Sequence, residues 1–239
     1  MILIVRGNRE FLCAPGEEVH TDLGVVEVPP DAEPGAVVES HLGEEFRVRK
    51  LRGPDLFAHL QRTGAPMVPK DIGLLVGHTG VASGDRVLDA GTGTGVLAAY
   101  LGRLGASVVT YERDAEFAEV ARENMELAGV ADRVEVRTGD VLDDLEALSA
   151  FDLVTLDTED ADIVVESAPD ILISGGFVSA YSPFVESARA VEKAAREAGM
   201  SDVETLETIQ RRMDFDDRGS RPTTKGIGHT GYLLIARAP

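Results

Sequence analysis

A glycine-rich loop that joins a short apolar run to a helical segment limits the possible folds of this chain more than any other feature. The run Arg86-Val87-Leu88-Asp89 is followed directly by Ala90-Gly91-Thr92-Gly93-Thr94-Gly95 and then by residues of helical period. A strand, a glycine loop and a helix in this order are typical of an open α/β sheet, in which ligands bind at the carboxyl ends of the strands. Glycines let a ligand approach the backbone closely, and the helix N-terminus offers free N–H donors.

The spacing of these glycines and an acidic residue before them indicate which ligand binds. Gly91, Gly93 and Gly95 form the pattern G-x-G-x-G, whereas a dinucleotide-binding loop would place its third glycine at Val96. A nicotinamide cofactor is therefore disfavoured. Asp89, two residues before the first glycine, can accept a hydrogen bond from a ligand ammonium group, which points to a nucleoside that carries an amino acid.

Further acidic residues end the strands that follow. Glu112, at the end of the second strand, is placed to bind both ribose hydroxyls, and Asp140, beyond the third strand, to receive the exocyclic amine of an adenine. Asp157 ends the fourth strand, where its side chain would face the sulfonium methyl group and the incoming nucleophile. Each acid alone could be an ordinary loop or turn residue. Asp89, Glu112 and Asp140 together predict a site for S-adenosylmethionine.

The pattern of apolar residues predicts an α/β fold. From residue 69 onward, long segments of helical period alternate with short β-branched runs, as in a parallel sheet with crossover helices. The last two strands have no helix between them, which predicts a terminal antiparallel hairpin on the sheet. The expected helices are 69–78, 94–104, 114–128, 160–168 and 183–198, and the expected strands are 85–89, 107–112, 133–138, 151–157, 177–182, 203–212 and 231–237.

The first part of the chain has a different pattern. Residues 1–55 alternate apolar and polar side chains in short runs, which are separated by turns such as Pro15-Gly16 and Pro29-Pro30-Asp31. This pattern predicts a small N-terminal β-domain at residues 1–65. A Rossmann-like catalytic domain at residues 66–239 is expected to follow it.

Composition limits the function further. Cys13 is the one cysteine of the chain, which excludes an intrachain disulfide and a multi-cysteine metal site, and no metal-ligand set is visible in the sequence. No apolar run approaches the roughly 20 residues that span a bilayer. The N-terminal residues do not read as a secretion signal. We therefore expect a cytoplasmic protein without a metal or a membrane segment.

Charge is distributed unevenly along this acidic chain. The 42 Asp and Glu exceed the 23 Lys and Arg, of which only four are Lys, and this balance is typical of adaptation to a cytoplasm with molar salt. Residues 211–239, however, hold six basic and three acidic side chains, and Arg47, Arg49 and Lys50 form a second basic cluster. Both places can hold a phosphate backbone, although such cations also occur on solvated edge strands that avoid aggregation.

Segments spread over nearly the whole chain resemble one known family. They comprise residues 20–21, 24, 40–46, 69–73, 89–93, 111–113, 124, 127–129, 175–177, 180–181, 221–224 and 229–232. In these segments the chain is similar to the tRNA adenine-N1 methyltransferases of the TrmI family, which modify T-loop adenine 58, especially in their archaeal form. Pro69-Lys70-Asp71-Ile72-Gly73 and His229-Thr230-Gly231-Tyr232 are much more specific than the glycine loop, which many methyltransferases share.

The resemblance implies a homotetramer whose N-terminal β-domain helps to hold tRNA, and a catalytic domain that flips the target adenine out of the T-loop. It implies that Asp157 is catalytic and that S-adenosylmethionine is the cofactor. The expected cofactor-binding residues are Asp89, Gly91, Thr92, Gly93, Thr94, Gly95, Val96, Glu112, Asp140 and Val141. The expected tRNA-binding residues are Tyr181, Arg221, His229 and Tyr232, together with Arg47, Arg49 and Lys50 from the charge pattern.

One loop departs from the family pattern. After its fourth strand the family usually has Asp-Leu-Pro-x-Pro, whereas this chain has Asp157-Thr158-Glu159-Asp160-Ala161. The loop loses two residues of fixed φ and gains two acids, which would change the adenine pocket. Two alternative functions stay open. One is a non-catalytic RNA-binding partner subunit of a tRNA methyltransferase, and the other is a methyltransferase that acts on a protein or a small molecule.

Overall fold

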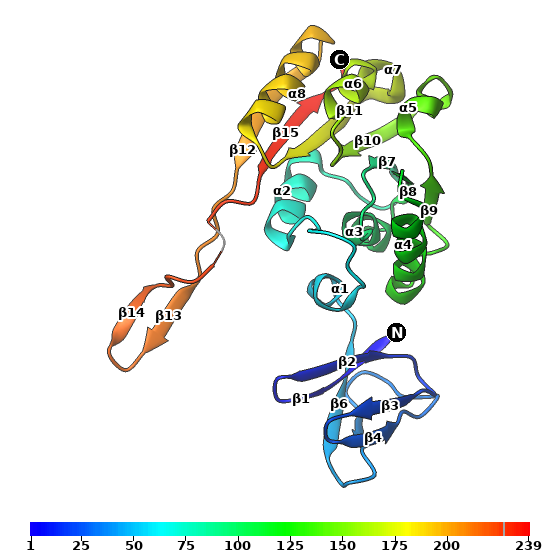
Figure 1. Ribbon diagram of the computed structural model, residues 1–239, viewed down its shortest axis with the longest axis vertical. Helices are drawn as coiled ribbons and strands as arrows, with labels where there is room; N and C mark the ends of the chain where they lie inside the picture. The colour runs from blue at the N-terminus through cyan, green and yellow to red at the C-terminus, as the bar shows by residue number, and fades with distance from the viewer. Residues whose placement is uncertain (227) are drawn as a thin grey trace.

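The structure is a computed structural model that describes residues 1–226 and 228–239 (Figure 1). Its larger part contains a seven-stranded sheet in the order β12-β15-β11-β10-β7-β8-β9. The pairs that β15 makes with β11 and β12 are antiparallel, and the other neighbouring pairs are parallel. The α/β fold and the terminal antiparallel pair are therefore confirmed. The strands are β7 (Arg86–Ala90), β8 (Ser107–Glu112), β9 (Val134–Thr138), β10 (Phe151–Leu156), β11 (Leu172–Ser182), β12 (Ser201–Glu207) and β15 (Tyr232–Arg237).

Helices cover both faces of this sheet. The apolar side chains of α2 (Pro69–Thr79), α3 (Val96–Leu104) and α4 (Ala115–Ala128) share one core with one face of the sheet. The second core contains side chains from α5 (Val141–Asp144), α6 (Ala161–Glu166), α7 (Ala168–Ile171) and α8 (Val185–Glu197). Val87 and Leu88, which are neighbours in β7, belong to different cores. Strands that are apolar on both faces are what a parallel sheet between two helix layers requires.

Several elements differ from the sequence-based expectation. The short helix α1 (Gly53–His59) and the turn of α5 with Leu145–Ala147 were not expected, because segments this short do not develop a helical period. The helix expected at 160–168 is divided into α6 and α7, and Pro169 lies in the first turn of α7. β11 begins at Leu172 rather than at 177.

Between β12 and β15 the chain leaves the sheet and forms a projecting arm (Figure 1). The arm is a hairpin of β13 (Met213–Asp216) and β14 (Gly219–Pro222), which pair only with each other. The strand expected at 203–212 therefore ends early, at Glu207. We call residues 208–212 and 223–226, which connect the hairpin to the sheet, the neck of the arm. The residues of the hairpin are exposed, including the apolar side chains of Met213 and Phe215.

The N-terminal part is a small antiparallel β-structure, as expected. Its four-stranded sheet has the order β2-β1-β6-β5, and β3 pairs with β4 in a separate hairpin. Phe46 and Val48 of β6 point into its core, so Arg47 and Arg49 between and after them are exposed. Because β6 lies between β1 and β5, these cations are not on an edge strand. The strands are β1 (Ile2–Arg6), β2 (Arg9–Cys13), β3 (Glu18–Thr21), β4 (Gly24–Glu27), β5 (Val37–Glu39) and β6 (Glu45–Lys50).

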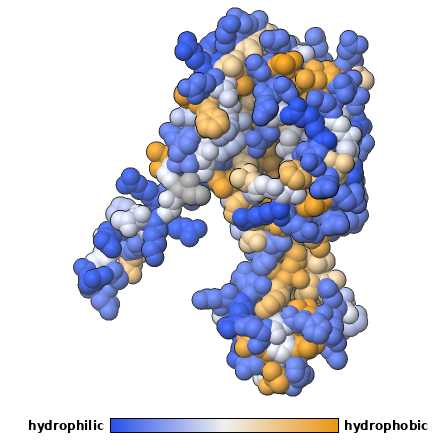
Figure 2. Space-filling model, in the orientation of Figure 1, coloured by the Kyte–Doolittle hydropathy of each residue, from blue (hydrophilic) through white to orange (hydrophobic). Residues whose placement is uncertain are grey.

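Apolar side chains join the two parts (Figure 2). Leu3 and Val5 of β1 belong to the same core cluster as Leu51 and Leu56, which also contains the helices of one sheet face. Helix α1 packs against α3, so the chain enters the core of the larger part before residue 65. The division at residue 65 remains a prediction. Within the described residues, no helix is long and apolar enough to cross a membrane.

Candidate active site

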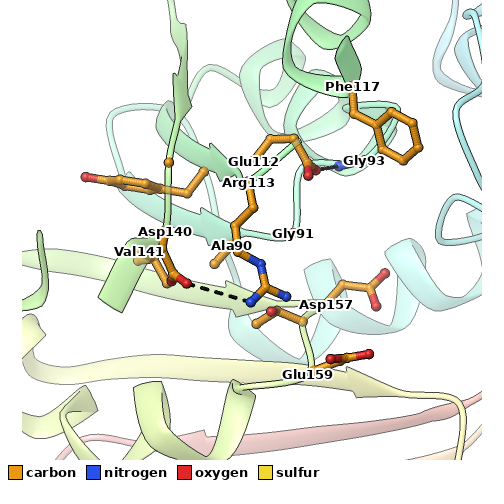
Figure 3. Close-up of a pocket in the computed structure, with 13 residues that line it drawn as sticks. Ala90, Gly91, Gly93, Glu112, Arg113, Phe117, Asp140, Val141, Asp157 and Glu159 are labelled. Carbon is orange, nitrogen blue, oxygen red and sulfur yellow. Dashed lines mark hydrogen bonds and ion pairs between the residues drawn. The ribbon is translucent and has the colours of Figure 1, made fainter. Parts of the chain in front are cut away.

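Three adjoining cavities meet at Asp157, directly after β10. The first, of about 350 Å³, is lined by the glycine loop and by Glu112, Asp140 and Val141 (Figure 3). The second, of about 60 Å³, lies between the glycine loop and residues 64–67 and is also lined by Asp89. The third, of about 410 Å³, lies toward the end of β11 and is lined by Tyr181. Asp157 lines all three cavities, as a group that acts between a cofactor and a substrate must.

The glycine loop is shaped mainly by contacts within the protein. A Cβ atom on Gly91 would overlap the carbonyl oxygen of Asp157, and one on Gly95 would lie 2.6 Å from Cε of Met125. The sequence argument, that glycine is needed for close approach of a ligand, is therefore not the reason for these two positions. At Gly93 the space is open, but φ is +51°, which favours glycine.

Glu112 and Asp140 are held in place by backbone N–H groups. Glu112 accepts hydrogen bonds from the N–H of Gly93 (2.8 Å) and of Asp114 (3.1 Å). Asp140 caps α5 by accepting from the N–H of Leu142 (3.0 Å) and lies 3.7 Å from the guanidinium of Arg113 (Figure 3). Both carboxylates keep free lone pairs toward the first cavity, because a carboxylate accepts about four hydrogen bonds.

Asp89 is buried beneath the loop. Its two oxygens accept hydrogen bonds from the hydroxyls of Thr155 (2.5 Å) and Thr110 (2.6 Å), and the hydroxyl of Thr110 also pairs with that of Thr92 (2.5 Å). Burial raises the pKa of Asp89, while the two threonine hydroxyls act in the opposite direction. Its oxygens thus have protein partners, and Asp89 also lines the second cavity.

Asp157 has a strongly perturbed carboxyl group. Asp157 has exposed surface, yet desolvation of its carboxyl group by the protein atoms around it and, second, repulsion from Asp89 raise its pKa to about 7. Its backbone N–H donates to the carbonyl of Ala90 (2.8 Å), which fixes the start of the loop after β10. A carboxyl group with this pKa can accept or release a proton near neutral pH.

A partly buried polar network lies beside Tyr181, which lines the third cavity. Lys70 donates to Asp71 (2.6 Å) and to the hydroxyl of Thr230 (2.7 Å), and Thr230 donates to the second oxygen of Asp71 (2.8 Å). These residues connect the two family-specific segments, which are about 160 residues apart in the chain. Tyr181 lies beside this network, and burial and repulsion from Asp71 and Asp157 raise its pKa, against the effect of the Thr230 hydroxyl.

The structure brings only some of the expected tRNA-binding residues to these cavities. Tyr181 lines the third cavity. His229 accepts or donates hydrogen bonds with Glu207 (2.7 Å) and with the carbonyl of Pro183 (3.2 Å), and its ring lies 5.0 Å from that of Tyr232. The contact with Glu207 is the main cause of the raised pKa of His229. Arg221 lies in β14, on the arm.

Sequence reasoning missed several residues that line the site. Arg113 and Phe117 line the first cavity and Phe184 lines the third. Lys70, Asp71 and Thr230 were part of the family-specific segments, but nothing in a single sequence indicates that they contact one another. Residues 64–67 carry no recognisable pattern at all. Of the other cofactor-binding residues expected from the sequence, Gly95 lines neither of the first two cavities and packs against α4, whereas these residues line one or both: Gly91, Thr92, Gly93, Thr94, Val96 and Val141.

The loop that departs from the family pattern crosses the edge of the first cavity. Asp160 lies 3.0 Å from the guanidinium of Arg113, which also approaches Asp140. Glu159 lines both the first and the third cavity. Glu159 and Asp160, the two acids of this loop, therefore take part in the site rather than only in the protein surface.

The polar groups of the first two cavities fit S-adenosylmethionine. Glu112 is available to ribose hydroxyls, Asp140 to an adenine amine, and Asp89 with the loop N–H groups lies beside the smaller cavity for an amino-acid end. With the reversed β15 between β11 and β12 and the glycine loop after β7, this site defines an S-adenosylmethionine-dependent methyltransferase of Rossmann-like fold.

Within this class, the chain belongs to a family of tRNA methyltransferases. The family model described as tRNA methyltransferase complex GCD14 subunit matches residues 54–219. The tRNA (adenine(57)-N(1)/adenine(58)-N(1))-methyltransferase TrmI of Methanocaldococcus jannaschii is 33% identical over 98% of this chain and 93% of its own length. The resemblance stated from the sequence is thereby confirmed.

Solved structures share the fold of this chain. An S-adenosylmethionine-dependent O-methyltransferase from Thermotoga maritima has a TM-score of 0.81 at 25% identity, over 99% of this chain and 92% of its own. The tRNA (m1A58) methyltransferase TrmI from Aquifex aeolicus has a TM-score of 0.76 at 22% identity, over 99% of this chain and 95% of its own. At this identity the second similarity concerns the fold alone.

Proposed function

We propose that this protein transfers a methyl group from S-adenosylmethionine to N1 of adenine 58 in the T-loop of tRNA. Adenine 57 is a second acceptor to be tested, because the archaeal relative is named for both positions. The observation that supports this proposal best is the place of Asp157, between the cavities that fit the cofactor and the cavity at Tyr181. Membership of the tRNA methyltransferase family speaks against the non-catalytic alternative.

S-adenosylmethionine, when bound, supplies an electrophilic methyl group. The residues of this chain then have to hold an adenine with the lone pair of N1 in line with that group. N1 lies on the pairing edge of the base, so the adenine must leave its stack before it enters the third cavity. In its ionised form Asp157 can accept a hydrogen bond from the 6-amino group, which orients the base, and can later take a proton from it.

We further propose that the two parts of the chain share the binding of tRNA. Residues 1–65 would position the RNA through the exposed side chains of Arg47, Arg49 and Lys50 on β6. Arg49 lies 3.5 Å from Glu10, an exposed ion pair that a phosphate can replace at little cost. In the larger part, Arg221 on the arm and His229 with Tyr232 would contact phosphates and the base.

The assembly and the cellular setting are part of the same proposal. We propose a homotetramer, supported by the exposed apolar side chains of Met213 and Phe215 on a projecting arm. A cytoplasm with molar salt is supported by the net charge of −19 and by the predominance of Arg over Lys. Sedimentation velocity in KCl from roughly 0.1 to 1 M, over which the Debye length falls about threefold, tests both together.

Nucleoside analysis tests the reaction itself. The protein is incubated in molar KCl with S-adenosylmethionine and unmodified tRNA, and the nucleosides are identified by mass spectrometry, in parallel with the Asp157→Ala variant. We expect 1-methyladenosine with the wild type and none with the variant. Cofactor binding without methyl transfer to tRNA would favour a protein or a small molecule as the substrate.

A further inference from the structure

The neck of the arm carries cations to which the proposed function has assigned no role. Arg211, Arg212 and Lys225 are exposed, and among the described residues no carboxylate forms an ion pair with any of them. All three lie in two adjacent segments of the neck, so their positive charges are close together and available to an anion.

Two of these cations share a groove with Lys70. The groove has a volume of about 800 Å³ and lies between the neck, α1 and the first turn of α2. Lys70, Arg212 and Lys225 line it, and Asp214 is the one acid among the described residues that do so. The groove is thus more basic than the surface around it, and it is large enough for part of a nucleic-acid backbone.

The ammonium group of Lys70 is held rigidly at one wall of this groove. Its side chain is 9% exposed, and two of its three N–H groups donate to Asp71 and Thr230. The third has no acceptor among the described residues. Burying a charge is expensive, and a buried ammonium with one donor left at a groove wall is well placed to bind an anion there.

Hydrogen bonds of the backbone also hold Arg212 and Lys225, the two neck cations that line the groove. The N–H of Thr223 donates to the carbonyl of Arg212 (2.8 Å), which joins the two segments of the neck. The N–H of Lys225 donates to the hydroxyl of Thr223 (3.1 Å). The side chains of Arg212 and Lys225 therefore start from fixed points on opposite segments, both facing the groove.

We propose that Lys70, Arg212 and Lys225 form a subsite for the sugar–phosphate backbone of the RNA whose adenine enters the third cavity. This inference rests on the proposed function. Thr230 lines the groove and lies beside Tyr181, which lines the cavity with Asp157. A phosphate in the groove would thus lie on one side of the Thr230–Tyr181 contact and the base on the other. The planar guanidinium and the two ammonium groups suit the tetrahedral oxygens of a phosphodiester.

The test measures how tRNA affinity depends on salt. Binding of fluorescent, unmodified tRNA in the presence of S-adenosylhomocysteine is followed by anisotropy over a series of KCl concentrations. The test variant is Arg212→Gln with Lys225→Gln. The control is Arg189→Gln with Lys193→Gln, which removes the same charge from the exposed side of α8. Lys70 is left unchanged, because its loss would leave Asp71 buried without its partner.

We expect the test variant to bind tRNA on the order of tenfold more weakly, with a slope of log Kd against log[KCl] that is smaller by roughly 1.5, as for two lost phosphate contacts. The control should stay within about twofold of the wild type, with the same slope, because charge lost outside the interface releases no counterions on binding. Affinity for S-adenosylhomocysteine should be the same in all three proteins.

Equal affinity and slope in the test and control variants would overturn the subsite. If the test variant binds tRNA more weakly than the wild type and the control, with the smaller salt slope, but the wild type forms no 1-methyladenosine, the proposed function fails and the subsite stands. If the wild type forms 1-methyladenosine and the test variant behaves like the control, the subsite alone fails. A wild type that binds no tRNA at any salt concentration overturns both.

Discussion

The molecule has two differently organised regions, represented by Asp89 near the carboxyl end of the central strand β7 and by Arg212 on the neck. Around the glycine loop, the acids already have short hydrogen bonds within the protein, as Asp89 has with Thr110 and Thr155. On the arm and neck, cations and apolar side chains are exposed, and Arg212 forms no ion pair in the described part of the chain. A site for a small cofactor is organised before the ligand arrives, whereas a surface for a macromolecule is completed by it.

The largest effect on catalysis is expected from Asp157→Asn. The amide keeps the size of the side chain but cannot carry the negative charge that orients and deprotonates the 6-amino group, so single-turnover methyl transfer should fall by about 10² to 10⁴-fold. Affinity for S-adenosylhomocysteine, measured by calorimetry, should change by less than about threefold. A rate within about tenfold of the wild type would show that Asp157 is not the group on which the reaction depends.

Lys70→Met is expected to have the largest effect on stability. It leaves Asp71, which is 2% exposed, without its cationic partner, and breaking a buried pair in this way costs about 3–5 kcal/mol. The free energy of unfolding from urea titration measures this. The control Thr230→Ser keeps the hydroxyl between Lys70 and Asp71 and should cost about 1 kcal/mol or less. Equal stability of Lys70→Met and the wild type would contradict the structural role of this network.

Gly91→Ala should be more harmful than Gly93→Ala, although both glycines belong to the same loop. The new Cβ atom at Gly91 would overlap the backbone of Asp157 at a φ of +91°, which we expect to cost about 3 kcal/mol and to disturb both cavities. At Gly93 the space is open, and the cost should be about 1 kcal/mol. Thermal unfolding and S-adenosylhomocysteine affinity of both variants test the difference. Similar losses would mean that ligand approach, not protein packing, selects glycine at Gly91.

The pH dependence of methyl transfer should follow the ionisation of Asp157. Because the pKa of this group is raised to about 7, the reactive carboxylate is lost as the pH falls through that value. The single-turnover rate should therefore fall about tenfold per unit below pH 7 and reach a plateau above pH 8. In the Asp157→Asn variant this fall of the rate below pH 7 should be absent. A wild-type rate that is constant between pH 5.5 and 7 would exclude the ionised form of Asp157 as the required one.

The smallest effect on stability is expected on the arm. Arg221→Ala removes an exposed side chain of β14, so the free energy of unfolding should change by less than about 0.5 kcal/mol. Its effect should appear only in tRNA affinity, as a loss of a few-fold that is reduced by added KCl. A marked loss of stability would show that the arm is part of the folded core, and the contrast between the two regions would then disappear.

Local patterns in the sequence predicted the elements that lie within one stretch of chain. The helix expected at 114–128 is α4, and in the structure Asp114 caps it by accepting from the N–H groups of Glu116 and Phe117. The position of the glycine loop was predicted correctly but the reason for its glycines was not, since a Cβ at Gly91 would meet Asp157, directly after β10, and one at Gly95 would meet α4. The short helix α1 was missed because its seven residues, about two turns, are too few for a helical period to be recognised.

The amino-acid sequence by itself determined the α/β order of elements, the glycine loop and the acids at the strand ends, because these depend on residues close together in the chain. Only the tertiary structure decided that Lys70 meets Thr230, that Asp157 lies between three cavities, and that the neck faces α2. Such contacts join residues that are far apart in the chain. They form when burial of the two apolar faces of the sheet fixes which strand ends are neighbours. No local sequence pattern encodes which distant residues are brought together.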